Sequence, residues 1–153
     1  MKIVALVALT ATAATFAAAD RAPAPRAVTA PADLTITYQR GPVAAEDGVA
    51  EFIELAPLDR TARTYRVARG TERFGTRTVT SRSVITSAAA DQLYAVVVGA
   101  DFFGLDRSYS DPDARDGAVS SLTVRAGARA SSVTVSNVSV PRFGRVVIAL
   151  GRL

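Results

Sequence analysis

The sequence predicts an α+β domain: an antiparallel sheet of five or six strands, with one amphipathic helix and a short C-terminal helix packed on one face. Several segments alternate apolar with polar residues, which is the period of a strand with one buried face. The segment Ser87–Gly99 and the segment after Pro141 instead carry apolar residues at helical spacing. A helix with one apolar stripe needs a sheet to cover, so the two patterns together indicate helices on a sheet.

Residues 1–19 have the pattern of a secretory signal peptide. Lys2 precedes an uncharged apolar stretch, and Ala17, Ala18 and Ala19 give a small-x-small cleavage pattern before Asp20. The stretch is short for a membrane span and lacks a basic flank that would stop transfer. We expect an exported bacterial protein, periplasmic or secreted, with no stable membrane span after cleavage.

Residues 20–33 are rich in proline and alanine, and we expect them to form an extended leader. A binding segment of the polyproline type is the alternative. Residues 34–153 are expected to form a single α+β domain. The chain contains no cysteine, although export would permit disulfides, so packing alone must hold the fold together.

Strands are expected before the helix at Leu34–Arg40, Val49–Leu55 and Arg77–Ile85, because β-branched and aromatic residues alternate there with polar ones. The segment Leu58–Gly70 fits two structures. An arginine at every third residue, with Asp59 and Gly70 as caps, would give a basic-striped helix. Its threonine, tyrosine and valine residues prefer strands, and we favour a strand.

The predicted helix Ser87–Gly99 begins after a Thr86 or Ser87 cap and presents an apolar stripe for packing on the sheet. A cluster of Phe102, Phe103 and Leu105 follows it. We interpret this cluster as part of the core, with a binding anchor for a partner as the alternative.

The clearest hairpin joins Val119–Arg125 to Ala130–Val138 through a turn at Ala126 and Gly127. Pro141 then begins the short C-terminal helix, because proline is favoured in the first helical turn. One side of that helix carries Phe143, Val146, Val147 and Leu150.

An acidic loop, Ser108–Gly117, precedes the hairpin. Its aspartates Asp111, Asp113 and Asp116 are weak candidates for calcium ligands. Arg115 stands where an EF-hand loop would need its third ligand, and no glutamate closes the loop. A turn-rich loop leading into the next strand is therefore the favoured interpretation.

Arginines recur from Arg60 to Arg82, where Glu72 is the only acid. They form either a patch for an acidic partner, an anionic glycan or a lipid headgroup, or an exposed sheet face. In the second case, which we favour, the arginines are solvated or pair with the acidic loop. The formal charge of +4 indicates solubility rather than nucleic-acid binding. The candidate partner-binding residues are Arg60, Arg63, Arg66, Arg69, Arg73, Arg77, Arg107 and Tyr109.

The composition excludes much of enzyme chemistry. The chain has no histidine or cysteine, and its only lysine, Lys2, lies in the signal peptide. Catalysis through Ser-His-Asp, Cys-His or a lysine is therefore excluded, as are the usual zinc and haem ligands. Carboxylate pairs remain, but no pair is singled out among the aspartates. We expect a non-enzymatic protein without a cofactor.

From Thr86 to Leu153, the order of helix, Phe-Phe-x-Leu, acidic loop, hairpin, proline and short helix resembles the emfourin-type inhibitors of thermolysin-like metalloproteases, or related small secreted bacterial domains of unknown function. The matching positions are Leu93, Ala100, Phe102, Phe103, Leu105, Asp116, Leu122, Val124, Val133, Pro141, Val147 and Leu150. The export signal and the Pro/Ala leader depart from that family. The resemblance implies a small α+β inhibitor domain, and it assigns no binding residue.

These observations lead to three hypotheses for function. The first is a secreted binding module, with a protein partner such as a secreted protease, that acts through the turns Gly41–Gly48 and Arg107–Gly117. The second is an envelope-associated structural module whose arginine-rich face binds anionic surfaces. A calcium-dependent domain is a third and weaker alternative.

Overall fold

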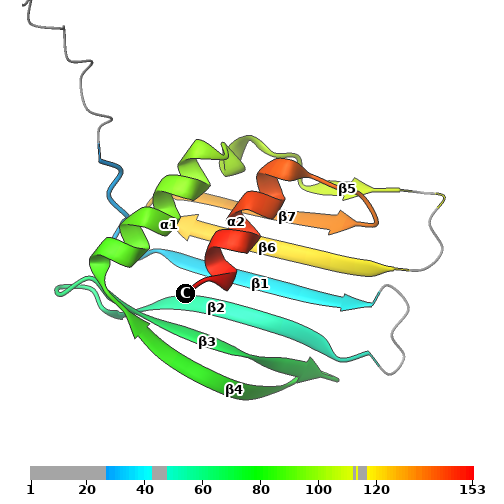
Figure 1. The fold of residues 1–153 in the computed structure, drawn as a ribbon, viewed down its shortest axis with the longest axis horizontal. Helices are drawn as coiled ribbons and strands as arrows, with labels where there is room; N and C mark the ends of the chain where they lie inside the picture. Colours follow the sequence, from blue (N-terminus) through cyan, green and yellow to red (C-terminus); the bar gives the residue numbers. More distant parts are fainter. Residues whose placement is uncertain (1–26, 43–47, 112, 114–116) are drawn as a thin grey trace, which may run out of the picture.

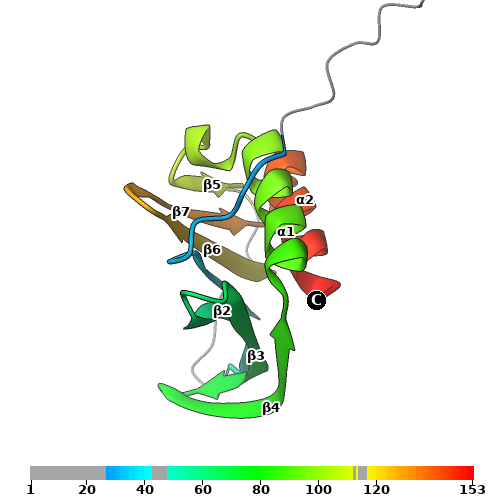
Figure 2. The same ribbon diagram turned by 90° about the vertical axis from the view of Figure 1, so that its left-hand side faces the viewer.

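The computed structural model describes residues 27–42, 48–111, 113 and 117–153. They form one mixed sheet of seven strands in the order β4-β3-β2-β1-β6-β7-β5 (Figure 1). Two α-helices, α1 and α2, lie on one side of the sheet, and no described element covers the other side (Figure 2). The α+β class with helices on one face is confirmed.

The strands are β1 (Thr35–Pro42), β2 (Ala50–Asp59), β3 (Thr64–Arg73), β4 (Thr76–Ile85), β5 (Ser108–Ser110), β6 (Ala118–Ala126) and β7 (Arg129–Ser136). The helices are α1 (Ser87–Gly99), the 3-10 helix η1 (Phe102–Gly104) and α2 (Pro141–Gly151). All neighbouring strands are antiparallel except β5 and β7, which are parallel.

The sheet therefore has more strands than the predicted five or six, and it is not wholly antiparallel. The strand that the sequence did not predict is β5, which lies in the segment expected to be a turn-rich loop. It contains only three residues, and Tyr109 pairs with Val135 at its centre. A strand of this length contains too few residues to show a period of two.

The ambiguous segment Leu58–Gly70 becomes a turn followed by strand β3, so the helical alternative is wrong. The carboxylate of Asp59 accepts hydrogen bonds from the amides of Thr61 (2.8 Å) and Ala62 (3.0 Å), which closes a tight turn. Arg63 follows with a φ of 51°, and the left-handed conformation turns the chain back into β3.

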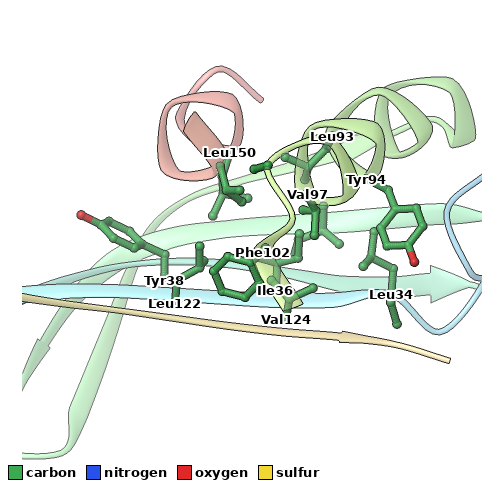
Figure 3. Close-up of a cluster of buried hydrophobic side chains, with 14 of the residues drawn as sticks. Leu34, Ile36, Tyr38, Leu93, Tyr94, Val97, Phe102, Leu122, Val124 and Leu150 are labelled. Atoms are coloured by element: carbon green, nitrogen blue, oxygen red, sulfur yellow. The ribbon is translucent and has the colours of Figure 1, made fainter. Parts of the chain in front are cut away.

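The core lies between the sheet and the helices. Ile36 and Tyr38 of β1 point towards the helices, and their neighbours across the sheet include Leu55 of β2 and Val124 of β6. Leu93, Tyr94 and Val97 of α1, Phe102 of η1 and Leu150 of α2 pack onto this layer (Figure 3). Phe102 and Leu105 are buried, as predicted for the aromatic cluster, whereas Phe103 is only partly buried.

The two helices begin where the sequence indicated. The Thr86 side chain caps α1 by accepting a hydrogen bond from the amide of Ala89 (3.4 Å). Pro141 occupies the first turn of α2. Arg142 of α2 donates to the carbonyl oxygens of Ala100 (2.8 Å) and Asp101 (2.7 Å), so it holds α2 against the end of α1.

The packed chain begins before Leu34, where the domain was expected to start. Ala30 is 1% exposed and belongs to the core, and Val28 packs against it. The last residues of the predicted leader are therefore part of the folded domain. Their proline and alanine composition gave no sign of this, because the groups that hold them come from distant parts of the chain.

Both edges of the sheet are poorly suited to pairing with another strand. At one edge, Ser81 of β4 pairs with Arg69 and Val79 pairs with Gly70, so Thr80 is an extra residue in a bulge. At the other edge, β5 has only three residues. Bulges and short edge strands are the usual means of blocking strand addition.

The bulge requires glycine at position 70. A methyl group on buried Gly70 would overlap the carbonyl oxygen of Thr78. We expect Gly70→Ala to lower the free energy of unfolding by about 1–3 kcal/mol, because the rigid backbone must shift. Urea unfolding measures the change.

Gly144→Ala in α2 provides the matched control, because a methyl group there meets no atom within 4 Å. We expect the control to be neutral or stabilising by up to about 1 kcal/mol, since alanine favours helix. Equal stabilities of Gly70→Ala and the wild type would show that the bulge does not need glycine.

Candidate functional site: an arginine cradle on the uncovered face of the sheet

The face of the sheet opposite the helices is polar, because the residues that alternate with the core residues point there. Its central strands present hydroxyl and amide groups, from Thr35, Thr37, Gln39, Ser121, Thr123, Ser132 and Thr134. Most of these side chains are partly exposed, and no described segment packs over them. A ligand approaching this face would meet hydrogen-bonding groups rather than apolar surface.

A hollow of about 170 Å³ lies on this face over β2, β3 and β4. It is lined by Phe52, Glu54, Ala56, Arg66, Ala68, Arg77, Val79 and Arg82. The small side chains of Ala56 and Ala68 leave room between the arginines, and Phe52 forms an apolar base. We call Arg66, Arg77 and Arg82 around Phe52 the arginine cradle.

Arg77 is the fixed member of the cradle. Its Nε donates to Glu72 (2.7 Å), its Nη1 donates to Glu54 (3.1 Å), and its guanidinium lies 4.9 Å from the ring centre of Phe52. The hydrogen bond to Glu72 raises the pKa of Arg77 above its ordinary value. Arg77 thus forms ion pairs with both Glu54 and Glu72. Its guanidinium also covers Phe52, which is 2% exposed.

Arg66 and Arg82 are the available members. Both side chains are exposed, and neither has a hydrogen bond or ion pair with any residue in the described part of the chain. An arginine guanidinium carries five N–H donors in a planar fork, which fits the two oxygens of a carboxylate or phosphate. The cradle therefore offers two free anion-binding groups beside a hollow.

Arg63, another predicted partner-binding residue, is used inside the protein. Its Nη2 donates to Asp91 of α1 (2.5 Å) and to the carbonyl oxygen of Ala30 (2.9 Å), and the amide of Ala30 donates to the same Asp91 oxygen (2.8 Å). The Asp91 hydrogen bond raises the pKa of Arg63. The hydroxyl of Tyr65 donates to the carbonyl oxygen of Pro31 (2.8 Å). Together these contacts form a clamp that holds residues 30–31 on α1 and β3.

The other predicted residues are spread over the molecule. Arg69 points to the helix side and donates to the carbonyl oxygen of Gly151 at the end of α2 (3.2 Å). Arg73 lies over the ring of Phe74, and Arg60 is exposed in the turn before β3. Tyr109 accepts a hydrogen bond from the amide of Asp106 (2.9 Å). Of the predicted set, the structure gathers only Arg66 and Arg77 in the cradle.

Arg107 lines a second hollow, of about 460 Å³, beside the half of β7 that β5 does not cover. Arg125, Thr123 and Ser132 line the same hollow from the uncovered face. Phe103 forms another wall, with the guanidinium of Arg129 lying 3.9 Å from its ring centre. Arg125 of the uncovered face therefore shares a second hollow with Arg107, away from the cradle.

Sequence reasoning missed three residues of these sites: Arg82, Phe52 and Arg125. A signal was present for Arg125, because it occupies the same polar phase of its strand as Thr123. Arg82 lay inside the arginine window but was not selected. Its position on the same face as Arg77 depends on the bulge at Thr80, which shifts the alternation of β4 between the two arginines.

The structure describes two of the three calcium candidates. Both Asp111 and Asp113 are exposed, and Asp111 accepts a hydrogen bond from the amide of Asp113 (3.0 Å), as in a turn. Asp116 lies outside the described residues. Within the described ranges, no group of three or more acidic, histidine or cysteine side chains could hold a metal ion. No helix in those ranges is both long and apolar enough to cross a membrane.

No family model matches this chain, and no curated protein matches it. The chemistry of the cradle and of the surrounding face therefore carries the functional argument.

The clamp gives a test of how the N-terminal residues are held. Tyr65→Phe keeps the buried ring and removes only the hydroxyl that donates to Pro31. We expect the free energy of unfolding to fall by about 0.5–1.5 kcal/mol, the usual net value of one hydrogen bond. Tyr38→Phe is the control, since its hydroxyl makes only a long contact with Ser120 (3.5 Å), and it should change stability less.

The same variant has a characteristic pH dependence. Burial raises the pKa of Tyr65 above the ordinary phenol value, whereas the unfolded chain titrates near the ordinary value of about 10. The stabilisation is therefore fully present below about pH 10 and is lost as pH rises through the folded-state pKa. A stability difference between wild type and Tyr65→Phe that stays constant beyond that pH would contradict this account.

Proposed function

We propose that this chain is a secreted, non-enzymatic binding module that holds anionic groups of its partner in the arginine cradle. The observation that carries the proposal is the contrast between the three cradle arginines. Arg77 is fully engaged with two glutamates, whereas Arg66 and Arg82 stand exposed beside the hollow with no partner among the described residues. Free guanidinium groups at a hollow are suited to binding carboxylate or phosphate.

The chemistry of the cradle supports binding rather than catalysis. The acids nearest to the hollow, Glu54 and Glu72, are both ion-paired to Arg77. General acid–base catalysis by a carboxyl pair needs two carboxyl groups that are free to contact the substrate. Here the same arginine binds both carboxylates. The chain also has no histidine or cysteine to act in their place.

Export is part of the proposal and is consistent with the packing. The signal-peptide pattern ends at Ala19, and among the described residues the first that packs on the core is Val28. Cleavage after Ala19 would leave all of the described domain intact. The uncovered face would then be presented outside the cytoplasm, in the periplasm or the medium, where anionic envelope polymers are available as partners.

A second candidate function is inhibition of a secreted metalloprotease, as the resemblance to emfourin-type inhibitors implies. The order of α1, η1, β6, β7 and α2 agrees with the order of elements on which that resemblance rests. Inhibition would use the turns Gly41–Gly48 and Arg107–Gly117, of which residues 43–47, 112 and 114–116 lie outside the described part of the chain. Loss of inhibition on shortening both turns, with the cradle intact, would favour this candidate.

Substituting the free arginines tests the proposal. We expect the double variant Arg66→Gln, Arg82→Gln to bind anionic cell-envelope material about tenfold more weakly than wild type, since charge-assisted hydrogen bonds are worth about 1.5–3 kcal/mol. Co-sedimentation at low salt measures binding. The melting temperature should stay unchanged, because these exposed side chains form no hydrogen bond or ion pair with the described residues.

Arg145→Gln is the matched control, because it removes an exposed arginine from α2 on the opposite side of the molecule. It should bind like the wild type. Equal weakening by Arg145→Gln would show that net charge matters and the cradle does not. Unchanged binding by the double variant would refute the proposal.

A further inference from the structure

The cradle and Arg125 lie on the same face and are connected by one row of residues across the strands. Arg66 of β3 pairs with Ala56 of β2, and Thr35 of β1 pairs with Arg125 of β6. Ile36 pairs with Leu55, so the next residues outward, Thr35 and Ala56, lie side by side. The row therefore runs from Arg66 through Ala56 and Thr35 to Arg125.

The sheet geometry fixes the length of this row. It crosses β3, β2, β1 and β6, which are consecutive strands of the sheet. Neighbouring strands lie about 4.8 Å apart, so the backbones at Arg66 and Arg125 are about 14 Å apart. Arg82 extends the basic surface beyond one end, and Arg107 extends it beyond the other. A single small anion cannot contact both ends.

The surface between the two basic ends is made of small and hydroxyl-bearing side chains. Thr35, Thr37 and Thr123 lie there with Ala56, and Thr123 is hydrogen-bonded to Ser132 (2.9 Å). Glu54 and Glu72 are the acids of this face in the described strands, and Arg77 binds both. Exposed Asp33, two residues before Thr35, accepts a hydrogen bond from the amide of Gly127 (3.0 Å). An anionic chain crossing the described strands along the row therefore meets no carboxylate that lacks a partner.

This surface offers few large apolar anchors to a folded protein partner: Val84, which pairs with Arg66, is 62% exposed, and Phe103 is partly buried beside the second hollow. Protein interfaces depend on aromatic and large apolar anchors that become fully buried. Phe52, the aromatic residue beneath the cradle, is already covered by Arg77. Addition of a peptide strand is hindered at both edges, by the bulge in β4 and by the shortness of β5. A ligand is therefore expected to lie across the face rather than along an edge.

From these observations we propose that the uncovered face binds a linear acidic polysaccharide of the polyuronate type, laid across β3, β2, β1 and β6. One carboxylate binds at Arg66 and Arg82, and another binds at Arg125 and Arg107. Between them, the hydroxyl groups of the sugar units meet the threonines of β1 and β6. This inference rests on the proposed function of the cradle and adds the chemical class and the direction of its ligand.

A polyuronate matches the order of charged and hydroxyl-bearing groups on the surface. It carries carboxylates at regular intervals, separated by hydroxyl groups, and the face carries arginines at both ends, separated by hydroxyl groups. An acidic peptide or a polyphosphate has the charge but not the hydroxyl groups. Two linked contacts strengthen each other, because binding at the first end raises the effective concentration at the second.

The test compares a short and a long ligand on the full chain as secreted. Titration calorimetry at low salt would use digalacturonate, which reaches one basic end only, and octagalacturonate, which can span both. We expect octagalacturonate to bind about a hundredfold more tightly. Arg125→Gln should remove most of this advantage and leave digalacturonate binding at the cradle unchanged. Arg145→Gln, on α2, should alter neither.

The outcomes separate this inference from the function on which it rests. Equal affinity for the two ligands, both weakened by Arg66→Gln, Arg82→Gln, would overturn the spanning ligand and keep the cradle. Tight binding of polyglutamate or polyphosphate, without binding of octagalacturonate, would overturn the polysaccharide and also keep the cradle. Ligand binding that the double variant does not change would overturn both.

Discussion

Burial on a single face of the sheet is the constraint on which the rest of this structure depends. The central strand β1 directs Ile36 and Tyr38 to the helices and Thr35 and Thr37 to the opposite side. A one-residue change of register would reverse these directions, so the packing of the helices fixes the register of the strands. Because no described element covers the opposite side, that face has to be polar.

The same constraint divides the arginines into two groups with different roles. Arg63 and Arg69 point to the helix side, where they bind Asp91, Ala30 and the end of α2. Arg66 points to the uncovered face and has no partner among the described residues. Of these three arginines, only Arg66 is therefore free to bind a ligand. The face of the sheet to which an arginine points therefore decides whether it stabilises the fold or is free to bind a ligand.

Elements with a strong local pattern were predictable from sequence. The helix after Thr86, the hairpin of β6 and β7 and the alternating strands each carry their signal within a few residues. Elements held by distant residues were not. Ala30 is fixed by Asp91, which lies 61 positions later, and β5 owes its pairing to β7. The proline- and alanine-rich segment contains no local pattern from which the contact of Ala30 with Asp91 could be predicted.

The candidate site was predictable only in part, for a related reason. The sequence indicated an arginine-rich region, but which arginines share a face depends on alternation, on the turn at Arg63 and on the bulge at Thr80. That Arg125 faces the same way as Arg66, three strands distant, follows from the sheet order, in which β1 separates β2 from β6. Sequence periodicity shows the phase within one strand and not the order of strands.

The central claim is that the uncovered face of the sheet is the binding surface. Mapping of amide chemical-shift changes in an isotope-labelled protein during titration with octagalacturonate tests it most directly. The account predicts changes that run across the strands, at Ala56, Thr35 and Arg125, with α1 and α2 unaffected. Changes confined to the helices, or to the turns at the ends of the strands, would contradict it.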